Sequence, residues 1–286
     1  MPRSVKELIE LLDLEKIEDN LFRGTQPDTL LQRVFGGQVA AHALVAATNT
    51  VDAEYVVHSM HSYFLRPGDT QVPIVYDVDP LRDGRSFATR RVVARQHGRP
   101  IYFLTASFQK SEVGLEHQDA MPDVLPAEDC PNLGELFRRR SAKHSDEWER
   151  EWAALEVRWA GDSRPDGQLD ATVHPAQARL WIRVNGELPD DPLLHQAAFA
   201  YASDMTLLGA TLVPHGVHIS SPSIQAASLD HTIWFHRPFR ADEWWLYDQV
   251  SPSASGGRGL AYGRVFTRDG TLVATVAQEG LIRHRD

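Results

Sequence analysis

Polar and apolar residues alternate most clearly between Gln225 and Phe239, in the segment QAASLDHTIWFHRPF. The pattern sets a hydroxyl, an acid and two histidines among large apolar residues and stops at an Arg-Pro pair. It predicts a β-strand that carries polar groups into an apolar environment. A weaker copy, HSMHSYFLRPG, begins at His58 and also ends at Arg-Pro.

The two copies mark a longer internal repeat. Each Arg-Pro pair is followed by a second apolar strand, IYFLTASF from Ile101 and LVATVAQE from Leu272. Superposing the two Arg-Pro pairs also superposes Ser107 on Gln278. A repeat of this kind predicts two half-chains of one design.

The first half-chain begins with an amphipathic helix predicted over Ser4–Ile17 and a short strand over Asn20–Arg23. A glycine pair in Phe35-Gly36-Gly37-Gln38 then precedes the alanine-rich run VAAHALVAATNTV, which predicts a thin central helix. Its N-terminus either offers free backbone N–H groups or simply packs tightly. Three strand-like runs follow between Val56 and Phe108, with turn signals between them.

The charged and proline-containing segment Ser111–His174 reads as the connection between the halves. It contains two short helices, near residues 135–142 and 146–154, and the first strand of the second half near Leu155–Ala160. The second half continues with a strand over Leu180–Val184 and a helix from Pro192 to about Leu208. Its further strands are predicted over Ser228–Phe235, Trp244–Val250, Gly259–Phe266 and Leu272–Glu279.

Each half therefore predicts a helix followed by an antiparallel meander that wraps around it. The fold class is α+β, without βαβ units. The expected boundaries are an N-terminal domain over residues 1–115, a linker over 116–150 and a C-terminal domain over 151–286.

Composition narrows the class of protein. A hydrophobic content of 42% suits a globular core, and no apolar run approaches the length of a membrane span. The single cysteine, Cys130, excludes an intramolecular disulfide and a thiolate metal cluster. With no signal peptide in view, we expect a cytoplasmic protein. The net charge of −10 argues against nucleic acid as a partner, although six arginines between Arg82 and Arg99 leave room for a phosphorylated ligand.

One acid stands out on the helix of the second half. Ala197, Tyr201, Asp204 and Leu208 fall on one face at helical spacing. A carboxylate on an apolar face is costly unless it is hydrogen-bonded or used, so Asp204 is either a satisfied structural acid or a catalytic group. Motifs of serine hydrolases, P-loops and zinc proteases are missing from the sequence, and we predict no metal site.

Five segments in order carry a family resemblance: FGGQVAAHAL, HSMHSYFLRPGD, Ser203-Asp204, SLDHTIWFHRPF and VAQEGLIR. Together they resemble the acyl-CoA thioesterase II family over about Leu21–Arg283. The resemblance implies a double hotdog fold and hydrolysis of acyl-CoA to free fatty acid and CoA. It further implies no cofactor and a homodimer or homotetramer of such chains.

The resemblance assigns the water-holding roles to Asp204, Ser228 and Gln278. Ser228 stands where the family often has threonine, which keeps the hydroxyl. The chemistry agrees, because an electrophilic thioester needs an oriented, partly deprotonated water and oxyanion stabilisation rather than a covalent nucleophile. In the first half, Val57 is matched with Ser228 and cannot orient a water. We therefore expect one active centre per chain.

Substrate-binding roles are assigned more loosely. Arg85 and Arg258, which lie in glycine-containing turns, are candidates for contact with the CoA phosphates, or are solubilising residues of hairpins. His58 either lines the site or bonds the backbone in the core.

Two other functions remain open. One is an acyl-CoA binding or regulatory module without turnover, against which the joint presence of three polar groups in the second half argues. The other is an enoyl-CoA hydratase, which the absence of any Asn-Pro pair makes the weaker alternative.

Overall fold

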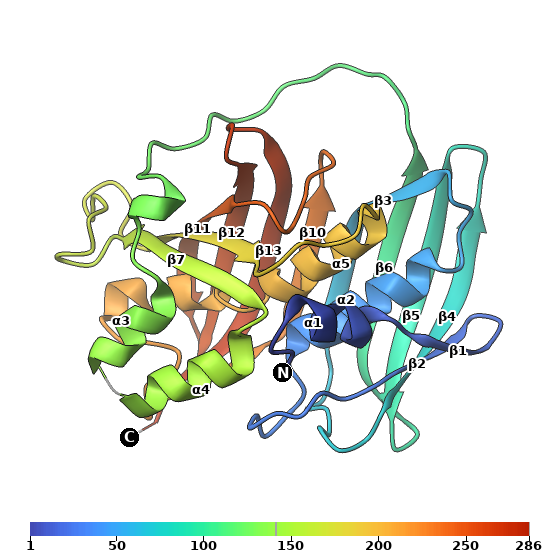
Figure 1. Cartoon of the computed structure of the whole chain (residues 1–286), viewed down its shortest axis with the longest axis horizontal. Helices are drawn as coiled ribbons and strands as arrows, with labels where there is room; N and C mark the ends of the chain where they lie inside the picture. Colours follow the sequence, from blue (N-terminus) through green and yellow to red (C-terminus); the bar gives the residue numbers. More distant parts are fainter. Residues whose placement is uncertain (141, 286) are drawn as a thin grey trace.

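A computed structural model describes residues 1–140 and 142–285. Across them, one antiparallel sheet of 13 strands curves around two central helices (Figure 1). This is the α+β arrangement that the sequence predicts.

The first half of the chain contributes two helices and six strands. The helices are α1 (Val5–Leu12) and α2 (Gly36–Thr48). The strands are β1 (Glu15–Glu18), β2 (Leu21–Gly24), β3 (Tyr55–Phe64), β4 (Ile74–Asp83), β5 (Phe87–Gln96) and β6 (Arg99–Lys110).

A long connection then crosses above the sheet (Figure 1) to a short 3₁₀ turn, η1 (Ala127–Asp129), and the helices α3 (Leu133–Arg140) and α4 (Ala142–Trp152). The second half adds α5 (Pro192–Ser203) and a 3₁₀ segment, η2 (Leu207–His215). Its strands are β7 (Leu155–Asp162), β8 (Gln177–Val184), β9 (Ile224–Ser228), β10 (Asp230–Phe235), β11 (Trp245–Ser255), β12 (Arg258–Thr267) and β13 (Leu272–His284).

The two halves share the sheet through β3 and β10, the two strands predicted from the Arg-Pro repeat. These strands pair antiparallel, with Met60 opposite Ile233 and Ser62 opposite His231. The strand order runs β1-β2-β4-β5-β6-β3-β10-β13-β12-β11-β8-β7, and β9 pairs with β13. Because equivalent strands run in opposite directions, equivalent hairpins of the two halves lie at opposite ends of the strands.

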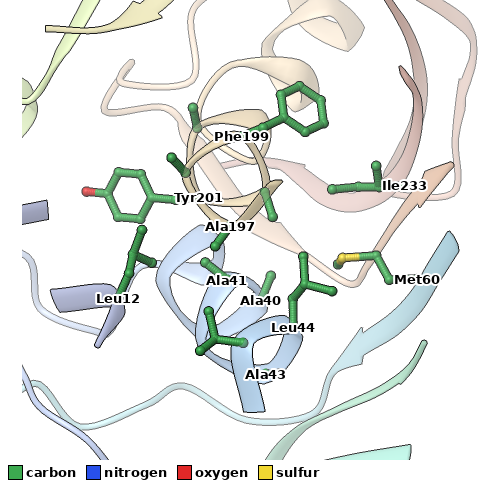
Figure 2. Close-up of a cluster of buried hydrophobic side chains, with 14 of the residues drawn as sticks. Leu12, Ala40, Ala41, Ala43, Leu44, Met60, Ala197, Phe199, Tyr201 and Ile233 are labelled. Carbon is green, nitrogen blue, oxygen red and sulfur yellow. The ribbon is translucent and has the colours of Figure 1, made fainter. Parts of the chain in front are cut away.

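The core lies between the sheet and the two alanine-rich helices. Ala40 and Ala41 of α2 face Ala197 of α5 (Figure 2), and all three side chains are fully buried. Small side chains let the helix axes approach closely and let a single sheet cover both helices. Larger residues, Met60 and Ile233 among them, fill the space toward the strands (Figure 2).

Two predicted helix ends and one predicted number of strands are wrong. The first helix ends at Leu12, where Asp13 adopts an extended conformation, and Glu15–Glu18 form an exposed strand. Between Val56 and Phe108 there are four strands rather than three. The helix of the second half ends at Ser203, so Asp204 caps its C-terminus instead of lying on a helix face that extends to Leu208.

The repeat also slips by one residue in its last strand. Ser107 lies opposite Ser59 and Thr89 and is half-buried, whereas Gln278 is fully buried and lies opposite Ala261. The residue of the first half that occupies the place of Gln278 is therefore Ala106, which is buried opposite Met60 and Arg90.

The match of Val57 with Ser228 holds. Val57 pairs with Phe108, two residues beyond Ala106, as Ser228 pairs with Gly280, two residues beyond Gln278.

Candidate active site

The side chains of Asp204, Ser228 and Gln278 meet in a buried polar cluster. The Ser228 hydroxyl donates to Asp204 Oδ1 at 3.0 Å, and Gln278 Nε2 donates both to Asp204 Oδ1 and to the Ser228 hydroxyl, the latter at 3.0 Å. Asp204 is 9% exposed and Gln278 is completely buried. The three residues come from the end of α5, the end of β9 and the middle of β13, so the tertiary fold alone brings them together.

Local structure explains how two of these residues reach the cluster. The chain bends at Leu229 between β9 and β10, where Leu229 N–H donates to Glu279 O and the Asp230 carboxylate accepts from Glu279 N–H. This irregularity lets Ser228 pair with the extension of β13 beyond Gln278. The predicted single strand over Ser228–Phe235 is thus two strands, and the break between them lies beside the site.

The N-terminus of α2, from the other half of the chain, completes the site. The Gly37 N–H donates to the Asp204 carboxylate. The residue before the helix, Phe35, provides no side-chain cap, so the first turn keeps N–H groups for a ligand. A methyl group on Gly36 would lie 2.5 Å from Asp204 Oδ2, and one on Gly37 would lie 2.2 Å from the Tyr201 carbonyl oxygen. Only glycine permits this approach.

Burial sets the charge state of the acid. Desolvation raises the pKa of Asp204 to about 6, against the opposing hydrogen bonds from Gln278, Ser228 and the Gly37 N–H. Its position at the negative C-terminal end of α5 also disfavours the carboxylate, whereas the positive N-terminal end of α2 favours it. The result is a carboxyl group that titrates near neutral pH and is mostly ionised at pH 7. The Oε1 atom of Gln278 is buried and lacks a hydrogen-bond partner among the described residues.

A second polar layer supports the end of α5. The Tyr247 hydroxyl donates to the Ser203 carbonyl oxygen at 3.1 Å, and Ser203 Oγ lies 2.8 Å from His231 Nε2. His231 is fully buried, which lowers its pKa to about 3, so the ring is neutral. Ser62 Oγ in turn donates to the His231 carbonyl oxygen at 2.6 Å. Sequence reasoning missed this layer, because its members come from α5, β3, β10 and β11 and share no local pattern.

The three predicted binding residues lie apart. His58 Nε2 bonds Ser107 Oγ at 2.8 Å, and its ring packs edge-on against Phe87. Arg85 is exposed in the β4–β5 hairpin, whereas Arg258, at the start of β12, bonds Glu279 at 3.0 Å. Arg258 lies opposite Leu281, three residues beyond Gln278, so it lies at the same end of the strands as the cluster. Arg85 lies in the equivalent hairpin of the first half, at the other end of the strands.

The described residues contain no group of three metal-ligating side chains. Within the same ranges, no helix is long and apolar enough to cross a membrane.

Comparison with protein families finds a match for each half of the chain. A model described as acyl-CoA thioesterase matches residues 155–281, and one described as acyl-CoA thioesterase N-terminal domain matches residues 26–109. Acyl-CoA thioesterase 2 of Haemophilus influenzae is 43% identical, with 98% of each chain covered. The chain belongs to the acyl-CoA thioesterase II family. Human acyl-coenzyme A thioesterase 8 is 40% identical, over 96% of this chain and 88% of its own.

Solved structures agree with this membership. The acyl-CoA thioesterase II TesB2 of Mycobacterium marinum superposes with a TM-score of 0.84 at 47% identity, covering 98% of this chain and 99% of its own. A hotdog-fold protein from Alicyclobacillus acidocaldarius superposes with a TM-score of 0.78 at 22% identity, which supports the fold alone. The predicted family, hotdog fold and enzyme class, a thioesterase, are confirmed.

Proposed function

We propose that this enzyme hydrolyses acyl-CoA to a free fatty acid and CoA through a water molecule held by Asp204, Ser228 and Gln278. The observation that carries the proposal is the buried carboxyl group with a pKa of about 6, bonded to a hydroxyl and an amide beside an uncapped helix N-terminus. A general base works best when its pKa lies close to the working pH.

The water is positioned before it reacts. It donates one hydrogen bond to the Asp204 carboxylate and the other to Gln278 Oε1, the buried acceptor that has no protein partner among the described residues. The Ser228 hydroxyl and the Gln278 amide also fix the carboxylate itself, so little reorganisation is needed when the water attacks.

The reaction then proceeds in two steps. The water oxygen forms a bond to the thioester carbonyl carbon while Asp204 takes the proton. N–H groups in the first turn of α2 stabilise the oxyanion, because the positive end of the helix faces the site. The C–S bond then breaks, and the proton passes from Asp204 to the thiolate of CoA. This returns the carboxylate and leaves a free acid.

The CoA phosphates need a cationic contact, and Arg258 is the candidate at the same end of the strands as the cluster. Its guanidinium is half-exposed and bonded to Glu279, so it can exchange that partner for a phosphate. Arg85 is the weaker candidate, because its hairpin lies at the ends of the strands away from the cluster.

A free-thiol assay tests the proposal. Asp204→Asn should lower turnover of acyl-CoA by about 10²- to 10⁴-fold, because the amide cannot accept the proton. The control is Asp52→Asn, which changes an exposed acid in the same way and should leave turnover unchanged. Near-normal turnover by a folded Asp204→Asn variant would sink the assignment. Binding of acyl-CoA by the wild type without any thiol release would support the binding-module alternative.

A further inference from the structure

The last turn of α5 ends in the interior of the molecule, immediately before Asp204. The final carbonyl oxygens of a helix have no partner within the helix, so a buried helix end needs other donors. The Ser203 hydroxyl donates to the Ala200 carbonyl oxygen at 3.0 Å, which leaves its own oxygen to accept from His231 Nε2–H at 2.8 Å. The Ser203 carbonyl oxygen accepts from the Tyr247 hydroxyl at 3.1 Å.

The bond from Tyr247 acts directly on the acid. The carbonyl group of Ser203 and the N–H of Asp204 belong to one planar peptide unit, so fixing the carbonyl oxygen fixes the plane from which the acid departs. The hydroxyl proton also lies against the negative end of the helix, where it offsets part of the field that disfavours a carboxylate. Burial, with a smaller contribution from the charge of Asp204, raises the pKa of Tyr247, so the hydroxyl keeps this proton.

The first half contains an equivalent tyrosine with a different partner. Tyr76 of β4 superposes on Tyr247 of β11 in the repeat, and each lies between matching neighbour strands. The Tyr76 hydroxyl donates to His42 Nδ1 at 3.1 Å, because His42 Nε2–H donates to the Leu11 carbonyl oxygen at 2.7 Å. The tyrosine of the first half therefore meets the middle of α2, whereas that of the second half meets the end of α5.

A glycine explains why the two rings differ. Gly263 of β12 lies diagonally across from Tyr247, and a methyl group added to it would overlap the Cε2 atom of that ring. Glycine inside a strand often marks such a close approach. The equivalent residue of the first half is Val92, which is fully buried. A tyrosine ring can therefore lean over this position only in the second half, the half that contains Asp204.

We propose that Tyr247 is a positioning residue for the reaction, whose hydroxyl holds the peptide unit between Ser203 and Asp204 so that the carboxyl group faces the N-terminus of α2. The proposal rests on the proposed function, because it takes Asp204 to be the base. Gly263 belongs to the same device, since it gives the ring the room to reach the helix end.

Tyr247→Phe removes the hydroxyl and keeps the ring. We expect kcat to fall by about tenfold or more with little change in KM, because bound substrate then meets a misplaced acid. The midpoint of the kcat/KM profile should move to higher pH, by about 0.3 to 1 pH units, since the uncapped carbonyl disfavours the carboxylate. The matched control is Tyr76→Phe, which removes a buried, hydrogen-bonded hydroxyl in the first half and should lower the melting temperature without moving kcat or the midpoint.

The midpoint belongs to the acid because the other titratable groups around it keep one charge state across the assay range. Burial raises the pKa of Tyr102 on β6 and of Tyr247, and it lowers the pKa of His231 on β10 to about 3. The acids of β10, β11 and β13 alternate with inward-facing residues and so lie on the outer face of the sheet. They are Asp230, Asp248 and Glu279. The helix α2 and the strands β9 and β13 contribute uncharged donors, namely the Gly37 N–H, the Ser228 hydroxyl and the Gln278 amide.

Gly263→Ala tests the same bond from the other side. The added methyl group forces the ring of Tyr247 away from the Ser203 carbonyl, so this variant should also move the midpoint upward. Because both substitutions remove one bond, the double variant should show no further shift. Additive shifts would overturn the proposal. So would a Tyr247→Phe variant that loses stability as Tyr76→Phe does but keeps the wild-type kcat and midpoint.

An NMR titration separates this proposal from the proposed function. The carboxyl carbons of carbon-13-labelled aspartate report ionisation without turnover, and Asp204→Asn identifies the signal of the acid. An upward move of the Asp204 midpoint in Tyr247→Phe supports the positioning role even if kcat/KM follows another group. An unchanged Asp204 midpoint contradicts it even if Asp204 proves to be the base.

Discussion

Asp204 is held between two opposing influences. Burial and the C-terminal end of its own helix disfavour its charge, while Ser228, Gln278 and the Gly37 N–H stabilise it. The balance leaves a pKa of about 6. The acid is therefore basic enough to take a proton from water, yet it is mostly ionised at pH 7.

The dependence of rate on pH should report this balance. We expect kcat/KM to rise as pH increases and to reach half of its plateau near pH 6. Gln278→Ala removes a hydrogen bond that lowers the pKa of Asp204, so the midpoint of the kcat/KM profile should move to higher pH. The plateau of the profile should also fall. Profiles of both proteins from pH 4.5 to 9 test this, and a midpoint that moves downward in the variant would contradict it.

The stability of the folded protein should change with pH in the direction opposite to its activity. The folded-state pKa of Asp204 is raised above its ordinary value of 3.8, so folded protein binds more protons than unfolded protein between about pH 4 and pH 6. The free energy of unfolding therefore falls as pH rises through that window, by at most about 3 kcal/mol.

Asp204→Asn removes this titration and should be the more stable protein at pH 8, by on the order of 1 to 3 kcal/mol. Urea unfolding of both proteins at pH 4 and pH 8 measures the difference. Equal gains at the two pH values would argue that packing, rather than the buried charge, is responsible.

At the level of elements, the site depends on two helix ends from different halves of the chain. The N-terminus of α2 approaches the C-terminus of α5 closely because Gly36 and Gly37 carry no side chains. The alanines along both helices permit the same closeness farther from the site.

Gly36→Ala should damage activity more than stability. Its methyl group would lie 2.5 Å from Asp204 Oδ2 and 2.9 Å from the Phe64 ring, so the carboxylate must move from its bonded position. We expect turnover to fall by more than tenfold. Gly98→Ala, in an open surface turn but with a φ of +72°, is the contrast, since it should cost some stability and no turnover. Thermal melts and the thiol assay compare the two variants.

Sequence alone predicted these elements better than their ends. Period-two strands and the glycine pair before an alanine run are local signals, so the sheet and α2 were predictable. The end of α5 at Ser203 depends on contacts such as the bond from the Tyr247 hydroxyl to the Ser203 carbonyl, which no local pattern reveals. The contact between the Gly37 N–H and Asp204 joins segments far apart in sequence. The slip from Ser107 to Ala106 arises because the β12–β13 turn is one residue longer than the β5–β6 turn.

For the whole molecule, the two halves offer unequal environments at equivalent places. Where the second half has Ser228 and Gln278, the first has Val57 and Ala106. Beside Ala106 the buried Arg90 bonds the carbonyl oxygen and hydroxyl of Thr50 just beyond α2, both at 2.9 Å. The residue of the second half that is equivalent to Arg90 is Ala261, which lies opposite Gln278. An arginine thus fills the space in the first half, and the hydrogen-bonded cluster of Asp204, Ser228 and Gln278 occupies it in the second.

This inequality predicts one active centre per chain. Hexadecyl-CoA is a thioether analogue of the substrate that cannot be hydrolysed. Calorimetric titration with it should give one equivalent per chain, and the bound analogue should inhibit turnover completely. The titration is best run with chain concentration fixed by absorbance. Two equivalents that both compete with substrate would refute a single centre.

The pairing of β3 with β10 has a consequence for how such a chain can evolve. A dimer of identical subunits must encode both of its pockets with one sequence, so any change that improves one pocket is imposed on the other. Once the two copies are joined in a single polypeptide, each can drift independently. One copy can then carry Ala106 where the other has Gln278, and it can bury Arg90 in its own core. The N-terminus of its α2 still contributes to the site of the other copy.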